Sequence, residues 1–149
     1  MKRVQRLMIA VAALLVLWAG LAYEVSRPQD ASGYLRTVLQ VAGSAHDAAA
    51  TGVLVAREQR RQHLTATYAV SAYDDAMKAV AGAQKKLGTE AAPDDASRAL
   101  RDRLAPLVEA AARALSDAAS ARDDSALGHA GAALQAAAQQ LNELIEDNR

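Results

Sequence analysis

The sequence contains no cysteine and no phenylalanine, and its one tryptophan and four tyrosines make up only 3% of its 149 residues. The absence of cysteine excludes disulfides, thiol catalysis, zinc–thiolate and iron–sulfur centres, and c-type haem attachment. The chain also lacks the glycine-rich nucleotide-binding, zinc-protease, nucleophile-elbow and calcium-loop motifs. We therefore expect neither an enzyme nor a bound cofactor, and we assign no catalytic residue.

An excess of charge is also missing, because 17 lysine and arginine residues balance 17 aspartate and glutamate residues. Proteins that bind nucleic acid attract its phosphate backbone with a positive field. A chain of zero net charge provides no such field over long distances, so we expect no nucleic-acid partner.

Alanine is abundant, at about a quarter of the chain. It is the best helix former, and its side chain fills little space. This composition predicts an all-α protein with thin side-chain layers and helices that approach one another closely. Small side chains also bury less apolar area, so we expect modest stability.

The N-terminal segment is the longest apolar stretch, uncharged from Leu7 to Ala22. As a helix it would span roughly 24 Å, slightly less than the ~30 Å hydrocarbon core of a bilayer. Trp18 and Tyr23 lie near its outer end, where aromatic residues meet the membrane interface. Three basic residues precede it: Lys2, Arg3 and Arg6. We therefore predict a transmembrane anchor over residues 1–25 of a single-pass bacterial membrane protein, with its N-terminus inside and its C-terminal domain outside.

The alternative interpretation of this segment is a cleaved signal peptide. Gly20 and Ala22 offer small residues at the positions before a cleavage site, although the apolar run exceeds a usual signal core. Cleavage would make the protein secreted, and both interpretations place the domain outside the cytoplasm. A linker over residues 26–31 then leads to a domain over residues 32–149.

The domain shows four segments with the apolar period of an α-helix. We expect helices over about 32–61, 67–87, 93–119 and 124–147. Their predicted apolar faces comprise Leu35, Val38, Ala42, Ala45, Ala49, Val53 and Ala56; Ala69, Tyr73, Ala76, Val80, Ala83 and Leu87; Leu100, Leu104, Leu107, Ala111, Ala114 and Ala118; and Leu127, Gly131, Leu134, Ala138, Leu141 and Ile145. Short connections between them predict an antiparallel up-down four-helix bundle. The first connection contains no glycine or proline, so the first two helices could instead form one continuous rod.

Several residues have the character of helix ends. Asp30 or Ser32 suits the N-cap of the first helix, and Asp123 or Asp124 suits that of the fourth. Gly88 suits the position just after the second helix, and Pro93 suits the first position of the third. Pro106 lies inside the third helix, where its missing N–H predicts a kink.

Histidines provide the candidate metal ligands. His63 and His129 are expected at the end of the bundle distant from the anchor, near Asp123 and Asp124. The sequence has no pair of histidines four residues apart and no Glu-x-x-His motif, which carry metal in helical bundles. We therefore assign no metal site and expect exposed, solvated histidines.

A cluster of arginines marks the end of the first helix. Arg57, Arg60 and Arg61 could bind an anionic partner or a phosphate. The simpler interpretation is that the helix macrodipole favours cations at this end. Tyr34, Tyr68 and Tyr73 could similarly line a ligand pocket, or they could simply fill a core that is otherwise alanine-rich.

These features predict a membrane-anchored bundle that acts as an accessory or scaffold protein through an unidentified protein partner or through self-association. The alternative is a small-ligand-binding bundle of the sensor type. The helices resemble the periplasmic sensor domains of chemoreceptors and histidine kinases in architecture alone, and this resemblance transfers no residue roles.

Overall fold

The computed structural model describes residues 30–149. The predicted anchor, with Leu7, Trp18, Ala22 and Tyr23, lies outside these residues, as does most of the predicted linker. Within the described part, no helix has the length and apolar character that a membrane span requires.

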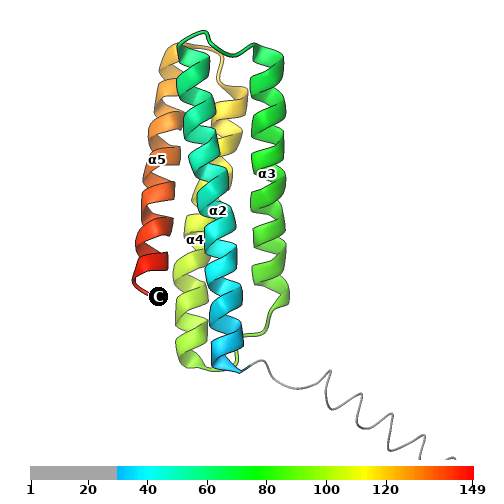
Figure 1. The fold of residues 1–149 in the computed structure, drawn as a ribbon, viewed down its shortest axis with the longest axis vertical. Coiled ribbons are helices and arrows are strands. Elements are labelled where there is room, and N and C mark those ends of the chain that lie inside the picture. Colours follow the sequence, from blue (N-terminus) through cyan, green and yellow to red (C-terminus); the bar gives the residue numbers. More distant parts are fainter. Residues whose placement is uncertain (1–29) are drawn as a thin grey trace, which may run out of the picture.

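Four helices account for most of the described residues: α2 (Ala31–Arg60), α3 (Ala66–Thr89), α4 (Asp95–Ser120) and α5 (Asp124–Glu146). Figure 1 shows that successive helices run in opposite directions, so that the α2–α3 and α4–α5 turns lie at one end of the bundle. The all-α fold and its four helices are therefore as predicted.

The break between α2 and α3 excludes the continuous rod. Gln62 has a φ of 59°, which is left-handed backbone. Its N–H donates to the Gln59 carbonyl (3.0 Å), and the His63 N–H donates to the Glu58 carbonyl (2.9 Å). This is the Schellman arrangement that ends many helices, with glutamine in the place usually taken by glycine. No glycine marks this turn in the sequence.

Each helix begins with a side-chain cap. Asp30, Thr65, Asp94 and Asp123 accept hydrogen bonds from the backbone N–H groups of Gly33, Tyr68, Ser97 and Ala126, respectively. These bonds satisfy N–H groups that have no partner inside the helix. The caps of α2 and α5 are thus Asp30 and Asp123, each one of two residues that the sequence offered.

Two predicted helix ends were wrong. Gly88 lies inside α3, which continues through Thr89, where the side-chain hydroxyl donates to the Lys86 carbonyl (3.1 Å) and extends the last turn. Pro93 lies outside α4, because the Asp94 cap fixes the helix start at Asp95.

Pro106 does not interrupt α4, which runs through it as one helix. Pro106 has no N–H to donate to the Asp102 carbonyl. Both residues are exposed, so this carbonyl lies at the solvent side of the helix.

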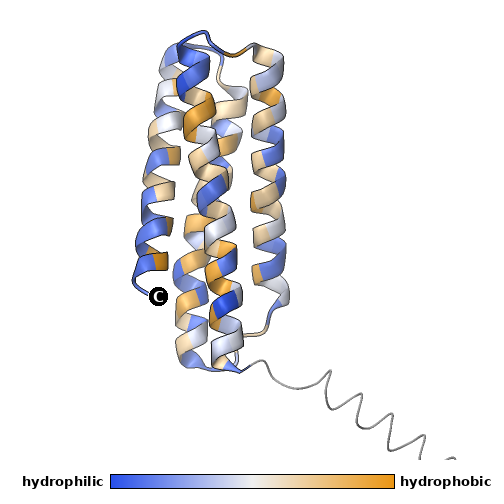
Figure 2. Cartoon of the chain, in the orientation of Figure 1, coloured by the Kyte–Doolittle hydropathy of each residue, from blue (hydrophilic) through white to orange (hydrophobic). Residues whose placement is uncertain are grey.

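All four helices contribute buried residues to one core, and α2 and α4 face each other across it. Both of these helices contact all the others, whereas α3 and α5 do not contact each other. Figure 2 shows apolar and polar residues alternating along each helix, the pattern of helices that bury one face. The predicted faces of α2, α3 and α4 are largely buried, with Tyr34, Val108 and Leu115 as further core residues.

The predicted face of α5 was shifted by one residue in half of its positions. Leu127, Leu134 and Leu141 are buried as predicted. The other buried positions are Ala130, Ala137 and Leu144, each one residue before the predicted Gly131, Ala138 and Ile145, which are half-buried. Because α5 packs on both α2 and α4, residues on either side of the row of Leu127, Leu134 and Leu141 can be buried. The spacing of these leucines therefore does not decide which of two neighbouring positions is buried.

Gly52 sets the approach of α2 to the rest of the bundle. A Cβ at this position would lie 2.7 Å from Leu115 Cδ2 and 2.9 Å from Leu134 Cδ1. Both leucines are fully buried. The absence of a side chain at Gly52 therefore lets leucines of α4 and α5 pack directly on the α2 backbone.

Gly43→Ala and Gly52→Ala form a matched pair, because both glycines lie inside α2. No atom lies within 4 Å of a Cβ added at Gly43, so alanine there should raise the free energy of unfolding by up to about 1 kcal/mol. At Gly52 the added methyl group meets two buried leucines, and overpacking of this kind costs about 1–3 kcal/mol. We expect urea unfolding to give Gly52→Ala a free energy of unfolding at least ~1 kcal/mol lower than that of Gly43→Ala. Equal stabilities would contradict the tight contact.

Gln62→Gly should raise the free energy of unfolding by about 1 kcal/mol, since glycine adopts left-handed backbone without the ~1–2 kcal/mol penalty of other residues. The matched control is Gln140→Gly, at an exposed position inside α5. There glycine should lower the free energy of unfolding by about 1 kcal/mol. Thermal unfolding of both variants checks the prediction, and a loss of stability in both would argue against the left-handed turn.

Candidate functional site

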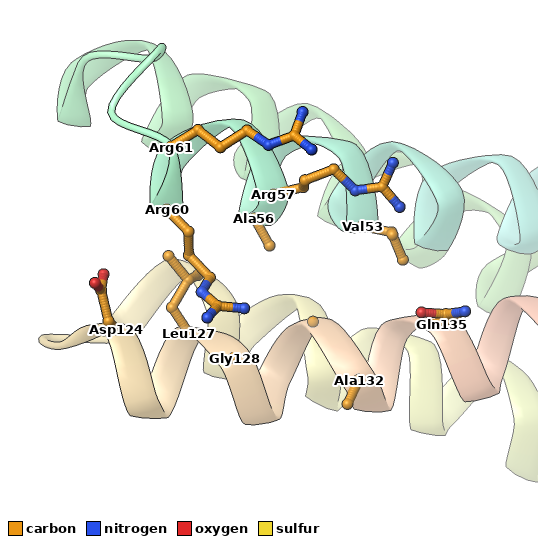
Figure 3. Close-up of a pocket in the computed structure, with 11 residues that line it drawn as sticks. Val53, Ala56, Arg57, Arg60, Arg61, Asp124, Leu127, Gly128, Ala132 and Gln135 are labelled. Carbon is orange, nitrogen blue, oxygen red and sulfur yellow. The ribbon is translucent and has the colours of Figure 1, made fainter.

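The candidate site is a groove between the end of α2 and the start of α5. Its volume is ≈ 560 Å³, and it is open to solvent along one side. All three arginines of the predicted anionic-partner patch line it. Figure 3 shows the residues that form it: Val53, Ala56, Arg57, Arg60 and Arg61 from α2, and Asp124, Leu127, Gly128, Gly131, Ala132 and Gln135 from α5.

Glu58, in the last turn of α2, pairs with one of the three arginines. Glu58 accepts from Arg61 Nη1 at 3.2 Å and lies 2.8 Å from His63 Nδ1. The hydrogen bond from His63, with a smaller contribution from Arg61, holds the pKa of the Glu58 carboxyl below its usual value. Arg61 and His63 thus share one acidic partner at the top of the bundle.

Arg57 and Arg60 have no such partner. Among residues 30–149, no acidic group lies within ion-pair distance of either guanidinium. Arg60 reaches across the groove to α5, where a Cβ on Gly128 would lie 3.7 Å from its Nη1. Asp124 lies at the end of the groove, and its carboxylate points away from the Arg60 guanidinium (Figure 3).

The floor of the groove consists of small residues. A Cβ on Gly131 would lie 3.6 Å from the Ala56 Cβ, which is an ordinary contact. Ala132 is exposed and adds only a methyl group to the wall. The groove therefore combines a low apolar floor with two guanidinium groups that lack acidic partners, and guanidinium binds carboxylate and phosphate oxygens through paired hydrogen bonds.

The four candidate metal ligands do not come together. His63 bonds to Glu58, whereas His129 and Asp123 line a separate groove between α4 and α5. Asp124 lines the α2–α5 groove instead. Within the described residues, no group of three or more histidine, cysteine, aspartate or glutamate side chains has the spacing of a metal site.

The tyrosines do not form the shared pocket that the sequence allowed. Tyr34 and Tyr73 are buried in the core near opposite ends of the bundle, and Tyr68 is 63% exposed. Tyr73 donates to Gln59 Oε1 (3.4 Å), and burial raises its pKa to about 12. The Tyr34 hydroxyl is buried without a hydrogen-bond partner among residues 30–149, and burial raises its pKa as well. These two tyrosines fill space that alanine cannot.

The α5 side of the groove was not predicted from the sequence. The apolar pattern places Gly131 on the buried face and gives Gly128 no role. The available signal was two glycines three residues apart, which share one face of a helix.

Comparisons with protein families, with curated proteins and with solved structures find no match to this chain.

Tyr34→Phe and Tyr73→Phe test the two buried hydroxyls. Removing the unpartnered hydroxyl of Tyr34 should leave stability unchanged or raise it by about 1 kcal/mol, because a buried polar group without a partner is destabilising. Tyr73→Phe should instead lower stability by about 0.5–1 kcal/mol through the loss of its bond to Gln59. Chemical unfolding of both variants measures the difference, and a clear loss in Tyr34→Phe would reveal a hydroxyl partner.

Proposed function

We propose that this protein is a non-catalytic helical bundle that binds another protein in an accessory or scaffold role. The observation that carries this proposal is a filled core surrounded by open grooves. The large side chains Tyr34 and Tyr73 occupy the interior, and neither lines any of the grooves between neighbouring helices. Open grooves between rigid helices suit a protein surface better than a small molecule, which usually binds where most of its own surface is buried.

A cavity surrounded by the three tyrosines would favour the sensor-type alternative. Tyr34 and Tyr73 are instead separate core residues, near the starts of α2 and α3 respectively, and this favours the accessory role. The remaining Tyr68 lines a shallow groove between α2 and α3 together with small and acidic residues.

The N-terminal sequence supports a tether at the outer face of a bacterial cytoplasmic membrane. Its apolar run and preceding basic residues favour an anchor. In the bundle, α2 begins after Asp30 at one end, and the arginine groove lies at the other end (Figure 1). A 30-residue helix is about 45 Å long, so the groove would be presented well away from the point of attachment.

Site-specific photocrosslinking of the full-length chain in its native cells tests the proposal. A photoreactive residue would replace one exposed residue on each of four grooves: Ala132, Ser71, Gln84 and Ala133. We expect at least one position to give a discrete, light-dependent adduct with another polypeptide in the membrane fraction. Samples kept in the dark, and the photoreactive residue placed at Arg36 near the opposite end of α2, serve as controls. The absence of adducts at all four positions, or turnover of a substrate by the purified chain, would contradict the proposal.

A further inference from the structure

We infer that the α2–α5 groove binds an acidic amphipathic helix of the partner protein, with carboxylates on Arg57 and Arg60. This inference rests on the proposed function and names the chemistry of the partner. It follows from the charge on the groove, from its floor and from its length.

The charge on the groove is positive at its α2 wall. Of the four charged groups that line it, Arg61 is engaged by Glu58, and Asp124 points away from the Arg60 guanidinium. Arg57 and Arg60 remain available, and Gln135 adds a neutral polar group at the far end. An occupant with negative charge along one edge therefore complements this wall.

The two arginines fit separate carboxylates better than one phosphate. Figure 3 shows the Arg57 guanidinium directed along α2 and the Arg60 guanidinium directed across the groove toward α5, so the two do not converge on a common point. Arg57 and Arg60 are three residues apart, which places their Cβ atoms about 5–6 Å from each other. Because the guanidinium groups diverge from these positions, two separate acidic side chains on a docked helix complement them better than one anionic group.

The floor admits a helix at close range. Gly131 and Ala132 present only backbone and a methyl group on the α5 side, where larger side chains would fill the groove, and the Arg60 side chain lies next to Gly128. Small residues of this kind let helices approach until their backbones are nearly in contact. From Leu127 to Gln135 the floor is about 12 Å long, which corresponds to two turns of helix. The occupant therefore presents alanine, glycine or serine to the floor and two acidic residues to α2.

Fluorescence anisotropy with designed peptides tests this inference on the full-length chain in lipid nanodiscs. The probe is a labelled, end-blocked, alanine-based helical peptide with two glutamates one turn apart, and the matched peptide carries glutamine at the same positions. We expect the glutamate peptide to bind at least tenfold more tightly than the glutamine peptide. This preference should shrink as salt is raised, because exposed charges are screened.

Variants locate the binding on the groove. Arg57→Gln and Arg60→Gln should each reduce the preference for glutamate at least threefold, and Arg36→Gln, near the other end of α2, should leave it unchanged.

Ala132→Leu should weaken the binding of both peptides at least fivefold by filling the groove. Its control is Ala133→Leu, another exposed alanine, which lines the neighbouring α4–α5 groove. Because leucine and alanine both favour helix, neither substitution should unfold α5.

Three results would overturn the inference. The first is equal binding of the two peptides, and the second is equal effects of Ala132→Leu and Ala133→Leu. The third is tight binding of pyrophosphate or anionic vesicles by Arg57 and Arg60 with no binding of the glutamate peptide. If any of these occurs while photocrosslinking still yields a partner from Ser71, Gln84 or Ala133, the inference fails and the proposed function stands. If no position yields an adduct, the proposed function itself fails.

Discussion

The closeness of α2 to its neighbours is the constraint on which the rest of the structure depends. A bundle in which about a quarter of the chain is alanine cannot fill wide gaps between helices, so its helices must lie close together. Gly52 removes the one side chain that would hold α2 away from Leu115 and Leu134. The contact between α2 and α4 across the core follows from this approach, and it leaves α3 and α5 on opposite sides without mutual contact.

The same geometry creates the grooves. Helices that meet through small residues leave shallow channels along their outer edges, and these channels are lined by the Arg57–Arg61 cluster, by Tyr68 and by His129. The α2–α5 channel carries two arginines, Arg57 and Arg60, that have no acidic group within ion-pair distance among residues 30–149, whereas Arg61 and His63 beside it are paired with Glu58. A local surplus of positive charge thus exists on a chain whose total charge is zero.

Much of the fold could be read from the sequence, and the failures have physical causes. Apolar period and short connections predicted four helices, because burial of one face decides helix position more strongly than any single residue. Helix ends were less predictable: Gln62 takes a conformation associated with glycine, whereas Gly88 remains in ordinary helix. In an alanine-rich helix such as α5, adjacent alanines offer nearly equal faces, so neighbouring contacts decide between Ala137 and Ala138. The arginine cluster was recognisable, but its opposite wall is a tertiary feature that no local pattern in α2 contains.

The positions of the two ends of the described chain have a practical consequence. Asp30 and Arg149 both lie toward the end of the bundle away from the α2–α3 turn (Figure 1), and Asp147 is linked to Arg103 of α4 at 3.6 Å. A fluorescent protein or affinity tag fused after Arg149 would therefore lie toward the end of the bundle where α2 begins, rather than over the arginines. Such a fusion offers a handle for imaging and purification that leaves the far tip of the bundle unobstructed.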